Sequence, residues 1–540
     1  MSLPSRHRRW RVALAGVAVL LVASACGGSG DTTGSAGGGD PVDGGTLNVA
    51  LSAEPDTLDP AGAAQAAAHQ VFMQIYDTLV WLDPASGQYV GGLATRWETS
   101  ADGTSTTFTL RSGVTFHDGT TFDAQAVKFS FDRILDPDFK SPVARAKLGP
   151  LRSVTAVDPT TVKLDYSAPY PALLNALSQH WLAIVSPAAV EKYGADFGKH
   201  PVGTGPMSFV EWAAGDHVTL QRTDAYAWGP AFLHQGKAYL EKLVFTIVPD
   251  DGARSAAVQS GDVQVAWNMP AADFSLLKDR GGDLEMVAAP WAGGSLALFL
   301  NTERAPTDDL AVRQAIQYGI NRTDLIDTAL FGIYTPAEGP ISPRTVGYAK
   351  AVEGRYPYDK AKAESLLDGA GWTMGGDGFR AKNGTRLALT IITHAQFKPI
   401  ATGIQGLLKP LGFDVAVDIR TAAAATDANG KGEGTGGITG LVDSDPGGIQ
   451  LLYHSKNYGG FDWSRVKDPQ IDGLLDQQAV ATDEATRAKL LADLQVAIMD
   501  KALIYPMYQG AFLYGVSGKV QNLRTNVLAY PYYADVWLTP

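Results

Sequence analysis

Residues 296–322 read LALFLNTERAPTDDLAVRQAIQYGINR. From the middle of this stretch onward, apolar side chains recur at helical spacing, at Leu310, Val312, Ala315, Ile316 and Ile320. We therefore predict a helix over Asp309–Ile326. Asp309 and Arg313 stand four positions apart on it, and if exposed they can form an ion pair worth about a few tenths of a kcal/mol.

The segments on both sides of this stretch predict a mixed α and β protein. Apolar spacing and capping residues indicate helices over four ranges: Ala66–Thr78, Phe122–Leu135, Asp359–Ala370 and Ala485–Lys501. Short alternating runs indicate strands at Gly45–Ala50 and Thr106–Leu110. No internal repeat occurs at a solenoid period.

Six segments, in chain order, resemble the family 5 extracellular solute-binding proteins of ABC importers, which include oligopeptide-, dipeptide- and nickel-binding proteins. The resemblance is carried by Gly44–Pro60, Val114–Ile134, His200–Phe209, Pro249–Trp267, Leu296–Arg322 and Tyr356–Trp372. Two positions depart from the family pattern: Gln125 stands where an acid is usual, and Met207 where a tyrosine is usual. The six segments lie between residues 44 and 372.

The resemblance implies an α/β fold with two lobes joined by a hinge, like the periplasmic binding proteins. Lobe I is expected over residues 45–290 with an extra subdomain at about 80–200, lobe II over 291–507, and a C-terminal return to lobe I over 508–540. The hinge candidates are Ala289–Ser295 and Met507–Leu513. The Gly293-Gly294 pair can absorb the dihedral change that closure requires.

The resemblance also implies the function. The chain is expected to capture a small polar solute, peptide or peptide-like, between the lobes and to deliver it to the permease subunits of an ABC importer. A ligand favours the closed state because only there do both lobes contact it. No cofactor and no enzymatic activity are expected, and the protein is expected to be a monomer.

In the peptide-binding relatives, a carboxylate just before an Asp-Pro pair binds the α-ammonium group of the ligand. The matching region is Gly436–Ser455, in which Asp445-Pro446 is the anchor and Asp443 is the candidate for the amine-binding carboxylate. The spacing to Pro446 is one residue shorter than in the family pattern, and Gly440 stands near the place of a usual tryptophan. A ligand that is a sugar or a metal complex therefore stays open. The alternative for Asp443 and Asp445 is an Asx-type turn before a helix.

Aromatic side chains near the expected lobe edges are candidates for stacking on the ligand, with burial in the core as the alternative for each. These are Tyr453, Trp463 and Trp291, together with Trp267 and Tyr505. The nine histidines show no metal-binding spacing, so no metal site is predicted. His117-Asp118 precedes Gly119 and is interpreted as a turn rather than as a catalytic pair.

The N-terminus predicts export and lipid anchoring. Residues 1–25 combine four arginines, an apolar run of eleven residues over Val12–Val22, and the small residues Ala23-Ser24-Ala25, which is the layout of a signal peptide. Cys26 follows directly and is the only cysteine in the chain. This arrangement resembles the bacterial lipobox, which implies lipidation of Cys26 and a flexible linker over residues 26–44. The site of action is therefore expected outside the cytoplasm, at the cell membrane.

The net charge argues against nucleic acid as a partner, and two rival functions stay open on other grounds. Residues 1–25 hold four of the 44 basic residues and no acidic one, so residues 26–540 carry 40 basic and 56 acidic side chains, a formal charge of −16. Such a surface does not favour nucleic acid.

The first rival function is a secreted hydrolase with paired carboxylates, although no Gly-x-Ser-x-Gly or metal-hydrolase motif occurs. The second is a ligand sensor on the same fold that takes no part in transport.

Overall fold

The computed structural model describes residues 40–540, which belong to one compact unit. The predicted signal peptide, Cys26 and most of the predicted linker lie outside these residues. Asp43 is already fixed to the body, because its carboxylate accepts hydrogen bonds from Arg222 and Lys237. In the described part of the chain, no helix has both the length and the apolar character needed to cross a membrane.

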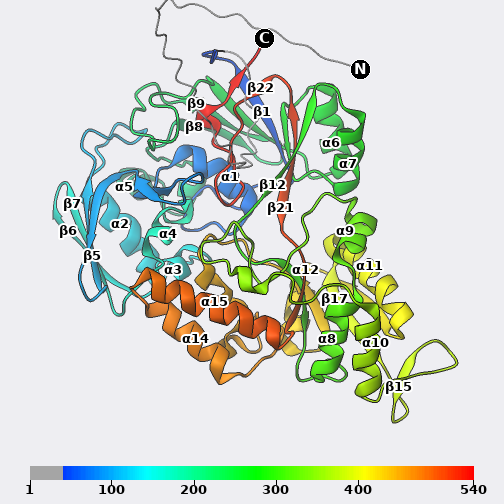
Figure 1. Cartoon of the computed structure of the whole chain (residues 1–540). Coiled ribbons are helices and arrows are strands. Elements are labelled where there is room, and N and C mark those ends of the chain that lie inside the picture. Colours follow the sequence, from blue (N-terminus) through cyan, green and yellow to red (C-terminus); the bar gives the residue numbers. More distant parts are fainter. Residues whose placement is uncertain (1–39) are drawn as a thin grey trace, which may run out of the picture. The chain divides into compact units, whose positions relative to one another are not determined.

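A seven-stranded sheet forms the first lobe (Figure 1). Its strands, in spatial order, are β12 (Leu284–Pro290), β21 (Ala511–Ser517), β11 (Val265–Trp267), β1 (Thr46–Leu51), β10 (Lys242–Ile247), β9 (His217–Arg222) and β8 (Met207–Ala213). The central strand β1 pairs parallel with β10 and β11. Its apolar side chains are buried in the core of this lobe, which we call lobe I.

Helices cover the sheet of lobe I, and a separate small sheet extends it. The helices that pack on it are α1 (Ala66–Ile75), α6 (Asp251–Ser260) and α7 (Ala271–Arg280), and α4 (Leu173–Leu177) and α5 (Pro187–Tyr193) also belong to this lobe. The four-stranded sheet has the order β4 (Ala94–Thr99), β5 (Ser105–Leu110), β7 (Thr161–Tyr166) and β6 (Leu151–Asp158). Two helices, α2 (Ala124–Leu135) and α3 (Ala144–Lys147), pack beside it (Figure 1). The two-stranded ribbon β2 (Val80–Leu82) and β3 (Tyr89–Gly91) leads into this sheet.

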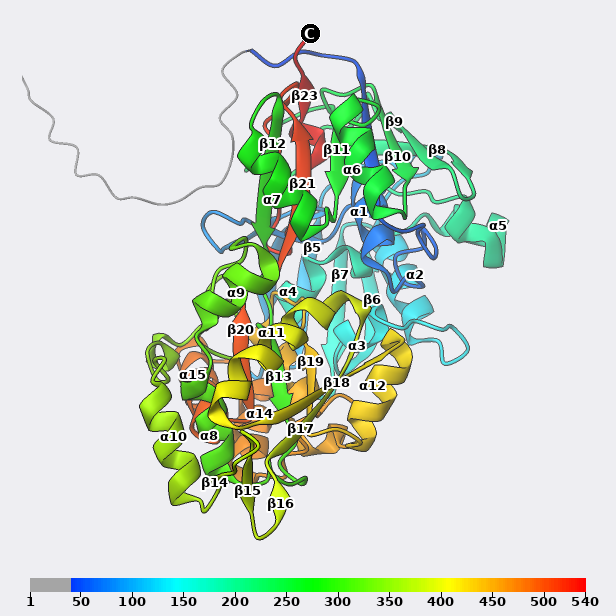
Figure 2. The same cartoon turned by 90° about the vertical axis from the view of Figure 1, so that its right-hand side faces the viewer.

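A five-stranded sheet forms the second lobe, which we call lobe II (Figure 2). Its order is β18 (Asp414–Arg420), β17 (Ala388–His394), β19 (Gly436–Thr439), β13 (Leu296–Leu300) and β20 (Ile504–Tyr508). Its helices are α8 (Leu310–Gly319), α9 (Arg322–Leu330), α10 (Lys360–Gly369), α11 (Lys398–Leu408), α12 (Ala422–Lys431), α13 (Gln450–Tyr453), α14 (Pro469–Val480) and α15 (Glu484–Asp500). A small ribbon of β14 (Thr373–Met374), β15 (Arg380–Lys382) and β16 (Thr385–Arg386) projects from this lobe. The lobe has a hydrophobic core of its own.

The chain passes between the two sheets twice. Residues 291–295 connect β12 to β13, and residues 509–510 connect β20 back to β21. The remaining C-terminal chain stays with lobe I, where β22 (Val520–Gln521) pairs with β23 (Trp537–Leu538) and Tyr533 enters the core. Trp291 packs against the cores of both lobes.

Most helices predicted from the sequence are confirmed, but one prediction is wrong in its extent. Residues 309–326 form two helices, because α8 ends at Gly319 and Asn321 caps the start of α9 by accepting hydrogen bonds from the backbone N–H groups of residues 323 and 324. The predicted Asp309–Arg313 ion pair is absent from the ion pairs within residues 40–540. Arg313 is buried and donates instead to the carbonyls of Thr307, Asp308 and Lys501.

Candidate ligand-binding site

Asp443 lies on the segment that follows β19, and this segment is bonded directly to the interlobe connection. The backbone N–H of Gly294 donates to the carbonyl of Leu441 at 2.6 Å, and that of Asp443 donates to the carbonyl of Ala292 at 3.2 Å. Gly293 has a φ of +136°, and a Cβ atom added to it would lie 2.1 Å from the carbonyl oxygen of Leu441. The position of the Asp443 loop is therefore coupled to the backbone that joins the lobes.

The side chain of Asp443 bonds to residues of lobe I. Lys147, at the end of α3, places its Nζ atom 3.3 Å from Oδ2 of Asp443. Gln179 donates from Nε2 to Oδ1 of Asp443 at 3.2 Å. Both members of the ion pair are largely buried, with side-chain exposures of 16% for Lys147 and 18% for Asp443. The described conformation thus brings the two lobes together at this carboxylate.

Ser444 adds a second polar contact between the lobes. Its hydroxyl accepts hydrogen bonds from Nδ2 of Asn175 at 2.8 Å and from Nε2 of Gln179 at 3.2 Å. Gln179 also donates to Oδ1 of Asn175 at 2.7 Å, so the two amides form one network. We call Lys147, Asn175, Gln179, Asp443 and Ser444 the interlobe cluster.

Asp445 has a different role from Asp443. Its two carboxylate oxygens accept hydrogen bonds from Nη1 and Nη2 of Arg487 at 3.0 and 2.8 Å, a bidentate ion pair. Its Oδ1 also accepts from the backbone N–H of Gly447 at 2.7 Å and so caps the short 3₁₀ turn that starts at Pro446. This is the Asx-type arrangement that the sequence left open as an alternative, and both oxygens of Asp445 have protein partners.

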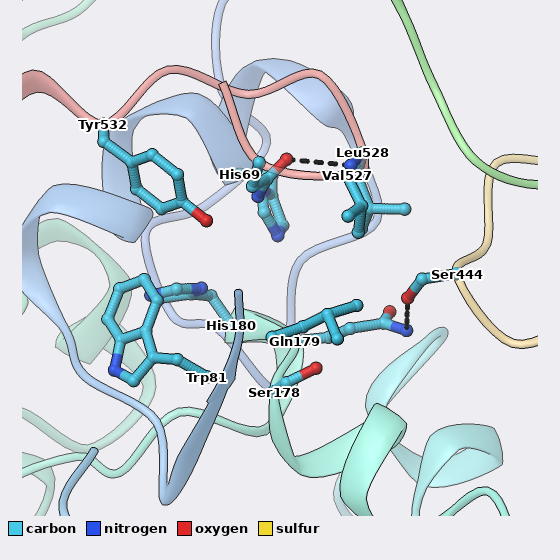
Figure 3. Close-up of a pocket in the computed structure, with 11 residues that line it drawn as sticks. His69, Trp81, Ser178, Gln179, His180, Ser444, Val527, Leu528 and Tyr532 are labelled. Atoms are coloured by element: carbon cyan, nitrogen blue, oxygen red, sulfur yellow. Dashed lines mark hydrogen bonds between the residues drawn. The ribbon is translucent and has the colours of Figure 1, made fainter. Parts of the chain in front are cut away.

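A small cavity adjoins the interlobe cluster (Figure 3). Its volume is about 20 Å³, enough for roughly one water molecule. Lobe I contributes most of the walls, lobe II contributes Ser444, and the C-terminal return contributes residues 526–528 and Tyr532. The lobe I residues that line it are His69, Trp81, Leu82, Ser178, Gln179 and His180.

Several polar atoms beside this cavity have no hydrogen-bond partner within residues 40–540. They are both ring nitrogens of His69, Nε2 of His180 and Nε1 of Trp81. Burial holds the pKa of His69 well below its usual value, and the positive charge of Lys147 acts in the same direction. Burial also lowers the pKa of His180 to about 3. Both imidazoles are therefore neutral at pH 7, and each can donate or accept one hydrogen bond to a ligand.

The aromatic residues predicted from the sequence lie elsewhere. Tyr453 is fully buried in lobe II and stacks on Phe299 at 5.7 Å between ring centroids, and Trp463 meets the same ring edge-on at 6.2 Å. Both belong to the core, which was the alternative for each residue. Tyr505 and Trp267 are buried as well. Trp291 lies in the connection between the lobes, against Phe512, and its indole Nε1 has no partner within residues 40–540.

Sequence reasoning missed most of the side chains that meet at the interlobe cluster. Asp443 was a candidate, but Lys147 and Gln179 carry no motif and lie 296 and 264 positions away from it. His69 and His180 were considered only for metal spacing. No group of three or more His, Cys, Asp or Glu side chains in the described residues has the geometry of a metal site.

The comparisons with known proteins agree with this two-lobed architecture. The family model of bacterial extracellular solute-binding proteins, family 5, matches residues 88–460. The chain belongs to this family. A glutathione-binding protein, GsiB of Salmonella paratyphi A, is 31% identical over 473 residues, which cover 85% of this chain and 88% of that protein.

Two solved structures of solute-binding proteins superimpose over 92% of this family 5 chain. NikA of Brucella suis, in complex with Fe(III)-EDTA, gives a TM-score of 0.82 at 25% identity and is covered completely. DppA of Helicobacter pylori, in complex with the peptide STSA, gives a TM-score of 0.75 at 26% identity and is covered to 99%. The α/β fold expected from the sequence is confirmed.

Membership of family 5 decides the general function. The protein is a solute-binding component of an ABC importer that binds a small ligand and delivers it to the permease, and it is not an enzyme. The family is extracellular, so the protein acts outside the cytoplasm. The hydrolase that the sequence left open as a rival function therefore has no support.

Proposed function

We propose that this protein captures a small peptide-like solute with a free amino group, and that Asp443 binds that amino group between the lobes. The observation that carries the proposal is the ammonium group of Lys147, which lies 3.3 Å from Oδ2 of Asp443. An ammonium group therefore fits at this carboxylate in the described conformation. A carboxylate and a partly desolvated ammonium form a short, charge-assisted bond.

The relatives support a peptide-like ligand. The similar GsiB protein is a glutathione-binding protein, and the DppA structure holds a peptide. Both ligands are built from amino acids. The NikA complex with Fe(III)-EDTA shows that the same fold also accepts a metal chelate, so the ligand class must be measured on this chain.

The test begins with native mass spectrometry of the protein produced without residues 1–26, which weighs any ligand that is retained. Calorimetry then measures the dissociation constants of glutathione and of alanyl peptides of two to four residues. We expect binding of at least one of these probes, and a loss of at least tenfold in Asp443→Asn. Asp493→Asn is the control, because within the described residues Asp493 pairs only with Lys489, on the surface of α15. Equal affinity of the wild-type protein and Asp443→Asn would refute the role of Asp443.

The attachment of the protein to the cell membrane is also a proposal. We infer that Cys26 is lipidated after removal of residues 1–25 and anchors the protein to the outer face of the cell membrane, and that the protein is a monomer. The sequence supports the lipid anchor: Cys26 is the only cysteine and follows Ala23-Ser24-Ala25 directly. An internal disulfide is therefore impossible, and a lipid anchor gives the thiol a role.

A further inference from the structure

We propose that the Lys147–Asp443 ion pair opens when the ligand binds, so that Asp443 takes the ligand's ammonium group and Lys147 takes its carboxylate. Lys147 is then a specificity-determining residue, and the ligand is a zwitterion that carries both groups. This inference rests on the proposed function, because it assumes that Asp443 is the amine-binding residue.

The hydrogen bonds of Asp443 leave one place for a cation. Oδ1 already accepts from Nε2 of Gln179 and from the backbone N–H of Asp445 at 3.1 Å. Oδ2 faces the ammonium group of Lys147, which makes no other hydrogen bond or ion pair within the described residues. A ligand ammonium that reaches Asp443 therefore occupies the position that Lys147 holds in this conformation.

Charge balance then determines what else the ligand carries. If an ammonium group displaces Lys147 from Asp443, two positive charges share one carboxylate in a site where both protein side chains are largely buried. An unpaired buried charge is costly, typically by several kcal/mol. A ligand carboxylate beside Lys147 removes this cost, because each charge again has a partner of opposite sign.

The neighbouring ionisable groups supply no other partner for Lys147. Asp445 is held by Arg487 in a bidentate pair. His69 and His180 are buried and neutral. Within the described interlobe region, the carboxylate that replaces Asp443 beside Lys147 must therefore come from the ligand.

The size of the site requires the lobes to separate before the ligand enters. The cavity beside the cluster has a volume of only about 20 Å³. Lys147 and Gln179 come from lobe I, and Asp443 and Ser444 come from lobe II, so separation of the lobes breaks the ion pair. A zwitterion bound between the separated partners then bridges Asp443 and Lys147 and joins the lobes again.

The experiment uses the protein without residues 1–26 and alanyl peptides of two to four residues. Each peptide is compared with its C-terminal amide and with its N-acetyl derivative by calorimetry, in the wild-type protein, Lys147→Met and Lys147→Arg. Lys163→Met is the matched control, because Lys163 pairs with Asp165 on the exposed side of the small sheet of lobe I. Circular dichroism and thermal unfolding check that every variant folds.

We expect amidation of the peptide to weaken binding to the wild-type protein at least tenfold. In Lys147→Met the free peptide binds more weakly, amidation costs less than twofold, and N-acetylation costs as much as in the wild-type protein. Lys147→Arg keeps part of the amidation effect because arginine also binds carboxylates, and Lys163→Met keeps all of it.

Two results would overturn the inference alone: an amidation cost that is equal in Lys147→Met and the wild-type protein, or tighter peptide binding by Lys147→Met. The second result would mean that Lys147 only competes with the ligand's ammonium group. If the wild-type protein binds none of the peptides and no glutathione, the proposed function fails as well.

Discussion

Asp462 lies in the core of lobe II with no exposed surface, although it carries a carboxyl group. Neither of its side-chain oxygens makes a well-formed hydrogen bond within residues 40–540. Burial raises the pKa of Asp462 to about 7, and the nearby backbone N–H groups of Val466 and Arg465 oppose this shift only in part. The folded protein therefore binds a proton at Asp462 more tightly than the unfolded chain does.

This difference predicts how the free energy of unfolding changes with pH. Since the folded pKa is raised, the contribution of Asp462 is fully present below about pH 4 and is lost as the pH rises to about 7, with an upper bound of about 4 kcal/mol. We expect Asp462→Asn to lose less stability than the wild-type protein between pH 5 and pH 8. Urea unfolding at both pH values measures the difference. An identical loss in both proteins would contradict this prediction, and Asp493→Asn serves as the control.

At the scale of structural elements, the backbone of the connection at residues 291–295 is held by several hydrogen bonds. The carbonyl of Gly293 accepts a hydrogen bond from the backbone N–H of Ser342 at 2.8 Å, and its N–H donates to Oγ1 of Thr345 at 2.7 Å. Its φ of +136° favours glycine, and the carbonyl of Leu441 leaves no room for a Cβ atom. The same element holds the Asp443 loop through the hydrogen bonds of Ala292 and Gly294.

We therefore expect Gly293→Ala to weaken ligand binding as well as to destabilise the fold. The added methyl group must push away the segment at Leu441 and move Asp443 with it. Gly282→Ala is a matched control, because Gly282 also has a positive φ, +105°, but a Cβ atom there meets nothing within 4 Å. Gly282→Ala should show the backbone strain alone, with affinity for the peptide probe unchanged. Equal affinities of Gly293→Ala and Gly282→Ala would show that the connection does not position the site.

At the scale of the whole molecule, function depends on where the two lobes are held. A solute-binding protein serves its importer best when it stays close to the permease, and the proposed lipid on Cys26 would provide this. We expect Cys26→Ser to move the protein from the membrane fraction into the medium, while affinity for the peptide probe stays within twofold. Cell fractionation with immunoblotting measures this. Retention of Cys26→Ser in the membrane fraction would mean that another anchor exists.

The sequence by itself determined the local structure and the family. Helix starts follow from short-range bonds between a side chain and the backbone two or three residues later, and Asp123 and Asp359 make these bonds as the sequence predicts. The six family-like segments likewise lie in the chain order that the sequence displays. Such features need no knowledge of distant residues, so the fold class and the capture of a solute could be predicted before the structure.

Only the tertiary structure decided which side chains share the site. Asp443 and Asp445 are two residues apart and an Asx-type turn was the alternative for both, yet Asp443 meets Lys147 of the other lobe and Asp445 is held by Arg487 within its own lobe. Residues 309–326 are a different case, since their apolar spacing is continuous but Asn321 starts a new helix after Gly319 through local bonds to the backbone. The partners of the two carboxylates, in contrast, depend on packing between segments that are far apart in the chain. Local periodicity and spacing carry no information about such contacts.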